Sequence, residues 1–252
     1  RRPSRPTAPS GRSGPPRRSA PPAGPSAALA EILPVEPSNP GDAALRRAGA
    51  VLIQGEVAAL PTDTVYGLCA RALDPEAVER LYRAKGRTEE KGAPVLIGHP
   101  DQLSLLAPQV PPRARLLMEA LWPGPLTLIL PPKPGLPGRL TGGGGGGVAV
   151  RLPAQNLCRA LALIAGPFAA TSANWPGEPP LRDPSVIAVR FGPRIALILD
   201  GGPLGEGPAS TVVDARGGRP VLIRKGGVPF EAVTRAWERG ERRAVTPDRA
   251  AG

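Results

Sequence analysis

The order of short strands and helices is the feature that most constrains the fold of this chain. β-Prone runs alternate with helical segments, but without the regular strand–helix–strand rhythm of an all-parallel sheet. We therefore expect an α/β fold in which a mixed, twisted sheet is flanked by helices. Strands are predicted at 57–60, 95–97, 126–130, 148–152, 168–171, 195–199, 210–213 and 221–224, and helices at 43–54, 75–85, 112–121, 155–165, 184–190 and 229–238.

The N-terminal segment differs in composition from the rest of the 252 residues. Its first thirty residues are Arg, Pro, Ser, Gly and Ala apart from Thr7 and Leu29, and no acidic residue precedes Glu31. Such a segment buries too little apolar surface to offset its ordering entropy. We therefore predict a disordered tail over 1–40, one folded domain over 41–238 and a C-terminal tail over 239–252. The 41% hydrophobic content is sufficient for one core.

The stretch from Leu60 to Arg87 has the layout of a binding site for a phosphorylated substrate. Thr62 follows the end of a strand, where a side-chain oxygen can bind a ligand or a nearby backbone N–H group. The helix that follows ends near Gly86 and so brings Lys85 and Arg87 together. Because cations at a helix end also complete its dipole, the function of this pair depends on the motifs around it.

Four more motifs place a polar or cationic residue at the edge of an apolar run: WPGPLTLIL at 122–130, VAVRLP at 148–153, ATSAN at 170–174 and STVVD at 210–214. Together with PTDTVYGL at 61–68 and KGR at 85–87, they form six motifs in a fixed order. In this order they resemble the YrdC-like family of threonylcarbamoyl-AMP synthases. The resemblance covers roughly residues 43–237, nearly all of the chain outside its tail.

The resemblance implies a YrdC-like domain over 41–238, in a short single-domain form. It implies an ATP-dependent nucleotidyltransferase that combines L-threonine, bicarbonate or CO2 and ATP into L-threonylcarbamoyl-AMP and releases pyrophosphate. Mg2+ is expected to accompany ATP, with no metal ligand assigned to the protein. The product would pass to downstream enzymes that transfer the threonylcarbamoyl group to tRNA.

The resemblance also implies roles for nine residues. Lys85 and Arg87 would be the catalytic phosphate clamps, Lys as a point charge and Arg as a bidentate fork. Arg151 would pair with the carboxylate of threonine, and Thr62 and Ser210 would make polar contacts to threonine. The nucleotide would be bound by Lys85, Arg87, Gly147, Ser172, Asn174 and Arg224.

Several of these residues also have an ordinary structural interpretation. Arg151 fits a surface arginine at a strand end, and Ser210 fits a plain strand start. Ser172 and Asn174 fit caps of the turn before Pro176. For Asp63 and Asp214 the alternatives are magnesium positioning and hydrogen bonding to local backbone, of which the second is favoured. Trp122 is expected to pack in the core.

The chain departs from the family pattern at three places. Gly92-Ala93 stands where the family usually has Pro-Leu after the KGR motif, and Gly147 stands where a threonine or similar residue commonly precedes the VAVR strand. Trp175-Pro176-Gly177 replaces the Ser-Gly pair that usually follows SAN. These differences bear on affinity and loop geometry more than on the class of reaction.

Two other functions remain open from the sequence. One is a module that binds double-stranded RNA or tRNA without catalysis, because the net charge is +11 and six arginines lie in the first eighteen residues. Three Trp, two Tyr and three Phe are too few for single-strand stacking platforms. The other is an enzyme that acts on a different carbamoyl-adenylate, as related domains do in hydrogenase maturation.

Missing residue types narrow the chemistry further. His99 is the single histidine and is expected in a solvated loop, while Cys69 and Cys158 fit buried, reduced thiols. No zinc ligand set or Walker loop is present, and the glycines at 142–147 fit a flexible loop before a strand. With no apolar run long enough for a membrane span, a cytoplasmic protein is expected. The arginine-rich tail leaves mitochondria open.

Overall fold

The computed structural model describes residues 29–88, 91–142 and 146–245. Its strands form one ten-stranded sheet in the order β1-β8-β2-β3-β7-β4-β6-β5-β9-β10. Pairs such as β1 with β8 are parallel, whereas β3 with β7 and β5 with β6 are antiparallel, so the expected mixed sheet is confirmed. The strands are β1 (Glu31–Pro34), β2 (Ala58–Leu60), β3 (Gly67–Arg71), β4 (Val95–Leu96), β5 (Leu126–Leu130), β6 (Val148–Arg151), β7 (Phe168–Ser172), β8 (Leu197–Asp200), β9 (Thr211–Asp214) and β10 (Val221–Arg224).

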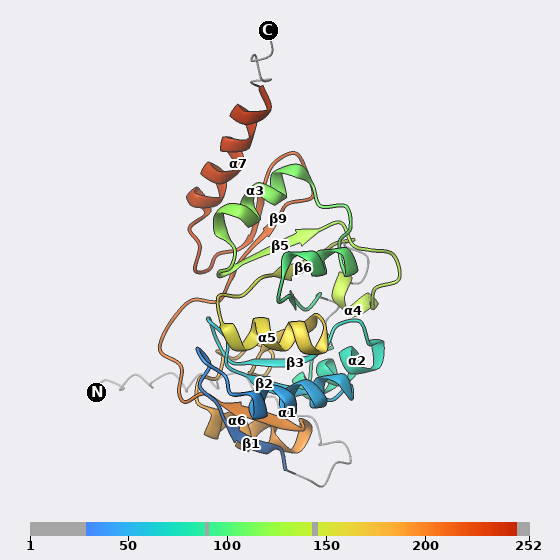
Figure 1. Ribbon diagram of the computed structural model, residues 1–252, viewed down its shortest axis with the longest axis vertical. Helices are drawn as coiled ribbons and strands as arrows, with labels where there is room; N and C mark the ends of the chain where they lie inside the picture. The colour runs from blue at the N-terminus through green and yellow to red at the C-terminus, as the bar shows by residue number, and fades with distance from the viewer. Residues whose placement is uncertain (1–28, 89–90, 143–145, 246–252) are drawn as a thin grey trace, which may run out of the picture.

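Helices flank this sheet along its whole width (Figure 1). Helices α1 and α5 pack against each other, α2 packs on β3, and α3 packs against α7 at the other end of the sheet. The helices are α1 (Asp42–Ile53), α2 (Pro75–Lys85), α3 (Pro112–Leu121), α4 (Gly138–Thr141), α5 (Asn156–Ala165), α6 (Pro184–Phe191) and α7 (Phe230–Val245), with short 3-10 helices η1 (Pro100–Leu105) and η2 (Gly192–Arg194).

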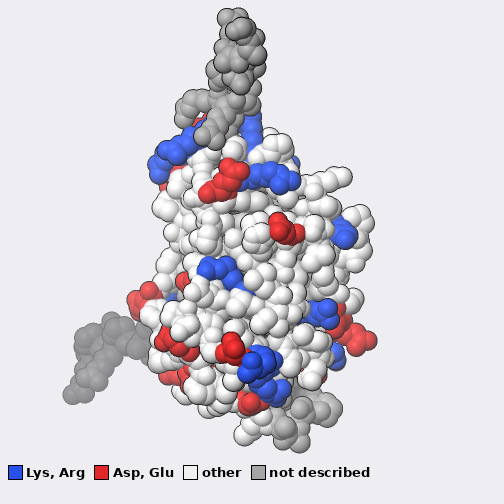
Figure 2. All heavy atoms as spheres, viewed as in Figure 1, with Lys and Arg blue, Asp and Glu red and all other residues white. Residues whose placement is uncertain are grey.

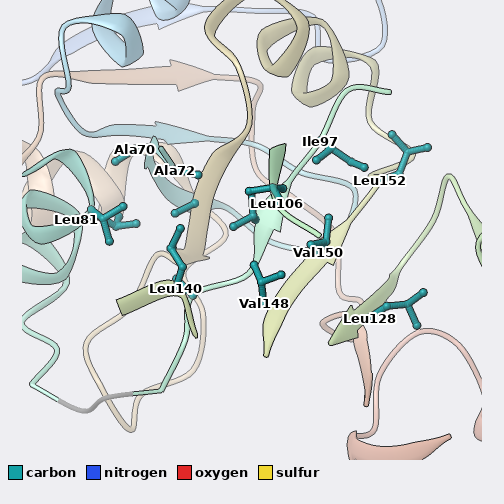
Figure 3. Close-up of a cluster of buried hydrophobic side chains, with 14 of the residues drawn as sticks. Ala70, Ala72, Leu81, Ile97, Leu106, Leu128, Leu140, Val148, Val150 and Leu152 are labelled. Atoms are coloured by element: carbon teal, nitrogen blue, oxygen red, sulfur yellow. The ribbon is translucent and has the colours of Figure 1, made fainter. Parts of the chain in front are cut away.

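Both faces of the sheet are buried because neighbouring side chains on a strand point to opposite sides. In β2, Ala59 belongs to one hydrophobic cluster, whereas Ala58 and Leu60 belong to a second cluster. Part of the first cluster is drawn in Figure 3, and it contains side chains from α2, such as Leu81, as well as side chains from β6, such as Val150. Two buried faces explain why the strands read as short apolar runs rather than as alternating ones.

Local signals set the bounds of α2, the helix that carries Lys85. The carboxylate of Asp74 caps its start, with Oδ1 accepting hydrogen bonds from Glu76 N at 2.9 Å and Ala77 N at 3.1 Å. Gly86 ends it in the left-handed region with φ 64°. The predicted helix at 75–85 is therefore confirmed residue for residue.

Two expectations about the ends of the fold are wrong, and one central strand is missing from the predicted strands. Strand β1 lies inside the segment predicted to be disordered, where it pairs with β8 at the edge of the sheet. Strand β3, which begins at Gly67, has no counterpart among the predicted strands, because its five residues are too short for a clear periodic signal. Helix α7 continues beyond 238 to Val245, since its polar second half is rich in helix-forming Glu, Arg and Ala.

Some expectations fall outside the described residues, and others concern the surface. Residues 1–28, most of the predicted tail, and 143–145 of the glycine run lie outside the described ranges. Cys69 and Cys158 are buried and unpaired, as expected. Within the described ranges, every helix is too short or too polar to cross a bilayer. Figure 2 shows Lys and Arg interspersed with Asp and Glu on the face drawn.

Candidate functional site

The loop of residues 61–66, between β2 and β3, is folded around the hydroxyl group of Thr62. This hydroxyl group accepts hydrogen bonds from Thr64 N and Val65 N, each at 3.2 Å, and donates to Val65 O at 2.7 Å. Because its hydrogen is used by Val65 O, the 3.0 Å contact between Thr62 Oγ1 and Thr64 Oγ1 has Thr64 as its donor. Thr62, which is 6% exposed, therefore shapes the loop and orients Thr64.

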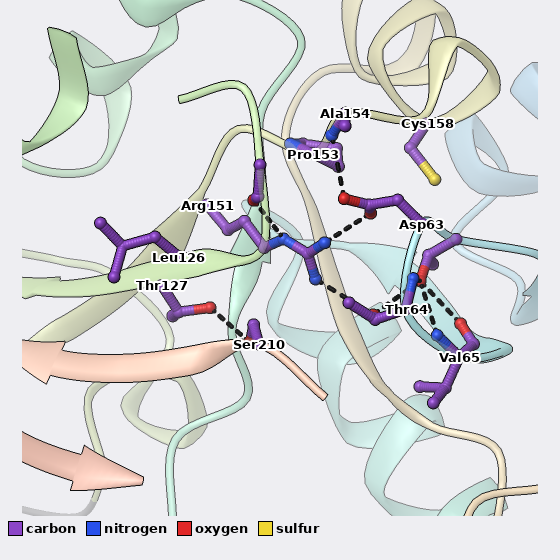
Figure 4. A network of polar contacts seen from close by, with 12 residues as sticks. Asp63, Thr64, Val65, Leu126, Thr127, Arg151, Pro153, Ala154, Cys158 and Ser210 are labelled. Atoms are coloured by element: carbon purple, nitrogen blue, oxygen red, sulfur yellow. Dashed lines mark hydrogen bonds and ion pairs between the residues drawn. The ribbon is translucent and has the colours of Figure 1, made fainter. Parts of the chain in front are cut away.

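Arg151, the last residue of β6, is held on three sides (Figure 4). Its Nε donates to Gly124 O at 3.0 Å, Nη1 donates to Thr64 Oγ1 at 3.2 Å, and Nη2 lies 2.5 Å from Asp63 Oδ1. The residue is 5% exposed. Asp63 is fixed in turn, because its Oδ2 accepts a hydrogen bond from Ala154 N at 3.1 Å. The arrangement gives a buried guanidinium group of fixed orientation, the geometry that binds carboxylates well.

Ser210 lies directly before β9 and is hydrogen-bonded to Arg224. Its Oγ lies 2.9 Å from Thr127 Oγ1, and Arg224 Nη2 donates to both the carbonyl oxygen of Ser210, at 2.9 Å, and its Oγ, at 3.0 Å. Partial burial, and then the charge of Arg151, lower the pKa of Arg224. The two arginines are therefore in electrostatic reach of each other. We call Thr62, Arg151, Ser210 and Arg224 the arginine group.

Lys85 forms a second group with the end of β7. Its Nζ donates to Ser172 O and to Asn174 Oδ1, both at 2.6 Å, and Ser172 Oγ donates to the same Asn174 Oδ1 at 2.5 Å. Lys85 is 4% exposed. We call Lys85, Ser172 and Asn174 the lysine group.

The side-chain amine of Lys85 has a lowered pKa. Burial, followed by the positive charge of Arg87, lowers the pKa of Lys85 to about 7, and Glu178 opposes this change. Near neutral pH the amine is therefore divided between its charged and neutral forms. An anion bound beside it would favour the charged form.

The 61–66 loop lies between the two groups. Thr64 contacts Arg151 in the first group, and the loop ends at Gly67, whose backbone pairs with Ser172 of the second group. The loop and its hydrogen bonds thus connect five of the nine predicted residues: Thr62, Lys85, Arg151, Ser172 and Asn174. Two more, Ser210 and Arg224, are hydrogen-bonded to each other, and Arg224 is linked to Arg151 by charge.

Arg87 and Gly147 lie outside these hydrogen-bonded groups. The Arg87 guanidinium lies 5.4 Å from the centroid of the Tyr82 ring, a cation–π contact on α2. A Cβ at Gly147 would come within 2.3 Å of Ile129 Cγ2. Packing therefore explains why glycine replaces the usual threonine here. At Gly92 a Cβ would approach Leu140 O at 2.5 Å, so this departure too has a steric reason.

Three polar residues of the site were missed or assigned differently from the sequence. Asp63 was interpreted as bonding local backbone or positioning magnesium, but it also pairs with Arg151. Thr64 and Thr127 received no role, although Thr127 is a fully buried threonine inside an apolar strand, a signal that could have revealed it. Asp214 accepts a hydrogen bond from the nearby backbone at Arg216 N, at 3.1 Å, as favoured from the sequence, and it also pairs with the Arg216 side chain. Among the described residues, no cluster of three His, Cys, Asp or Glu could hold a metal ion.

Two cavities of the described structure are lined by none of the residues of these two groups. A cavity of about 670 Å³ lies between η1 and α3, and one of about 470 Å³ lies beside the start of α2. The residues that line the larger cavity include Leu152, which follows Arg151 in the sequence, and Trp122, which lies close to Gly124 in the sequence. Trp122 is 9% exposed and its Nε1 donates to Leu126 O at 2.7 Å, which confirms its packing role.

Comparisons with known proteins place this geometry in a family. The profile Sua5_yciO_yrdC, described as Telomere recombination, matches residues 50–226. The threonylcarbamoyl-AMP synthase of Pyrococcus abyssi is 41% identical over 190 residues, and that of Bacillus subtilis is 43% identical over 194 residues. These matches cover 75% and 76% of this chain but 56% of each relative, so the chain spans about half their length.

Solved structures show the same similarity. P. abyssi Sua5 complexed with L-threonine superposes with a TM-score of 0.76 at 39% identity, covering 81% of this chain and 60% of that one. Escherichia coli YciO superposes with a TM-score of 0.74 at 27% identity, covering 81% of this chain and 100% of that one. The matched residues 50–226 contain both the arginine group and the lysine group. The chain therefore belongs to the Sua5/YciO/YrdC family.

Proposed function

We propose that this chain synthesises L-threonylcarbamoyl-AMP from L-threonine, bicarbonate or CO2 and ATP, with release of pyrophosphate. The observation that carries this proposal is the buried Arg151, fixed by Gly124, Thr64 and Asp63 in an orientation suited to a carboxylate. Two relatives, at 41% and 43% identity, are threonylcarbamoyl-AMP synthases, and this similarity supports the proposal. The P. abyssi Sua5 complex with L-threonine adds that a similar structure binds the amino acid.

In this proposal the arginine group binds threonine. The guanidinium of Arg151 pairs with the substrate carboxylate, which is stronger and more directional than a neutral hydrogen bond. Ser210 would offer its hydroxyl group to the substrate. Thr62 would act mainly through the loop, because its own hydrogen is already donated to Val65 O.

The lysine group would bind the phosphates and the nucleotide. The substrate amine attacks the carbon of CO2, loses a proton and becomes a carbamate, and a carbamate oxygen then attacks the α-phosphorus while pyrophosphate leaves. Lys85, Arg87 and Arg224 would offset the negative charge that develops on the phosphates. Ser172, Asn174 and the backbone at Gly147 would position the nucleotide. Catalysis would rest on positioning and electrostatics.

The cofactor and pathway assignments extend this proposal. Mg2+ would enter with the phosphates of ATP rather than through a set of protein carboxylates, and Asp63 is already paired with Arg151. The mixed anhydride product is reactive, so we propose that downstream enzymes use it to modify tRNA.

Pyrophosphate release gives a direct test of this function. We expect the purified chain to release pyrophosphate from ATP when threonine and bicarbonate are both present, and to fall to background when either is omitted. An assay with free L-serine in place of L-threonine as the substrate checks whether the arginine group distinguishes the extra methyl group of threonine. Release that continues unchanged without threonine would contradict the proposal.

The alternative of RNA binding without catalysis stays a prediction. On the face drawn in Figure 2, basic and acidic side chains alternate instead of forming a basic patch. Strong loss of RNA binding with added salt, beside absent pyrophosphate release, would favour that alternative.

A further inference from the structure

The ion pair of Asp63 and Arg151 places both signs of charge in the substrate end of the site. Nη2 of Arg151 lies 2.5 Å from Oδ1 of Asp63, and the two side chains are only 6% and 15% exposed. A carboxylate so close to the proposed carboxylate-binding arginine would repel an incoming anion. The pair therefore needs an explanation beyond the binding of a carboxylate alone.

Both partners keep hydrogen-bonding capacity that the described contacts do not use. Nη2 of Arg151 is buried and its contact among the described residues is the ion pair with Oδ1 of Asp63, although this nitrogen carries two hydrogens to donate. Asp63 accepts one hydrogen bond at Oδ2, from Ala154 N, while a carboxylate can accept about four. A donor and an acceptor of opposite charge thus remain side by side.

The charges around this pair decide what kind of ligand fits. Arg224 is hydrogen-bonded to Ser210 and is exposed to solvent, so it lies at the outer side of the arginine group. Arg159 of α5 is engaged with the carbonyl oxygens of Pro153 and Ala154. The innermost charges are therefore one guanidinium and one carboxylate, and they sum to zero. A ligand that is itself neutral overall but carries both charges leaves this balance unchanged, whereas a simple carboxylate adds an uncompensated anion.

We propose that Asp63 is a specificity-determining residue that recognises the α-ammonium group of the amino-acid substrate while Arg151 recognises its carboxylate. The ammonium and carboxylate groups of an α-amino acid are separated by one carbon. This close spacing matches that of Asp63 and Arg151, which are in direct contact. The inference rests on the proposed function, because it names how the same site selects its substrate. It assigns Asp63 to substrate selection rather than to magnesium.

Binding measured by calorimetry on the full chain tests this assignment. The ligands are L-threonine, 3-hydroxybutyrate, which lacks the amine, and threoninol, which lacks the carboxylate. We expect the wild type to bind threonine at least about tenfold more tightly than either analogue. In Asp63→Asn, threonine binding weakens by at least about tenfold, and the preference for threonine over 3-hydroxybutyrate shrinks by a similar factor. Asp214→Asn, at the pair with Arg216, is the matched control.

The outcomes separate this inference from the function on which it rests. If Asp63→Asn keeps the wild-type preference for threonine over 3-hydroxybutyrate, the inference is overturned while the enzyme assignment stands. If the wild type binds no threonine, both fail. Asp63→Glu keeps the charge and is expected to retain the preference, which distinguishes charge recognition from a general loss of folding if Asp63→Asn is unstable.

Discussion

Replacing Arg151 with alanine is expected to remove most threonine-dependent turnover. Truncating one partner of a buried, hydrogen-bonded charge pair in a binding site costs about 2–5 kcal/mol of binding free energy, which corresponds to a fall in kcat/KM for threonine of roughly 30- to 5000-fold. The physical reason is twofold, because the substrate carboxylate loses its guanidinium partner and Asp63 loses its counter-charge. Steady-state pyrophosphate release with threonine varied measures this change.

Two further variants separate chemistry from stability in this prediction. Arg151→Lys keeps the charge but not the planar fork, so we expect an intermediate loss. Arg47→Ala removes an exposed arginine that pairs with Glu31, a contact worth about 0–1 kcal/mol, and should leave turnover unchanged. If Arg151→Ala melts normally and keeps the wild-type KM and kcat for threonine, the carboxylate role of Arg151 is wrong.

ATP affinity is expected to fall as pH rises above about 7, because Lys85 then loses its charge. Below that pH the amine is charged and binds phosphate; above it the charged fraction falls by about tenfold per pH unit, and the apparent affinity follows this fraction. Bound phosphate raises the pKa of the amine again, so ATP binding above pH 7 should be coupled to proton uptake. Measuring KM for ATP across pH, at saturating threonine, reveals the dependence.

Substitutions at Lys85 assign that pH dependence to one side chain. Lys85→Arg stays charged at every accessible pH, so its KM for ATP should lose most of the pH dependence. Lys85→Met keeps the length of the side chain without charge and should bind ATP weakly at all pH values. A wild-type profile that persists unchanged in Lys85→Met would show that another group titrates, and the phosphate role of Lys85 would then lose its support.

All the α-helices except the four-residue α4 were predictable, because their signals are local. Asp74, Pro75 and Gly86 mark α2 within a few residues of each other, and the structure confirms these bounds. Strand β1 has no such signal, since four residues at a sheet edge are defined by their partner β8, which is distant in sequence. Strand β3 is absent from the predicted strands because its first residue, Gly67, is of a type that favours turns, whereas in the structure Gly67 pairs with Ser172 of β7.

The site was predictable only as far as its motifs reached. The six motifs identified Lys85 and Arg151, but spacing could not show that Lys85 donates to Ser172 and Asn174, which lie 87 and 89 residues away. The pairing of Asp63 with Arg151 was equally hidden, because it depends on how the 61–66 loop folds back on the end of β6. Contacts between distant segments follow from sheet topology, which short motifs do not encode.

Identifying the product most directly tests the claim that this chain makes a threonylcarbamoyl adenylate. The chain is incubated with ATP, threonine and ¹³C-labelled bicarbonate, and the nucleotides are separated and analysed by mass spectrometry. We predict an adenylate that contains threonine and a single labelled carbon in its carbamoyl group, formed together with pyrophosphate. Formation of ADP and phosphate, or of an adenylate without threonine or label, would contradict the account.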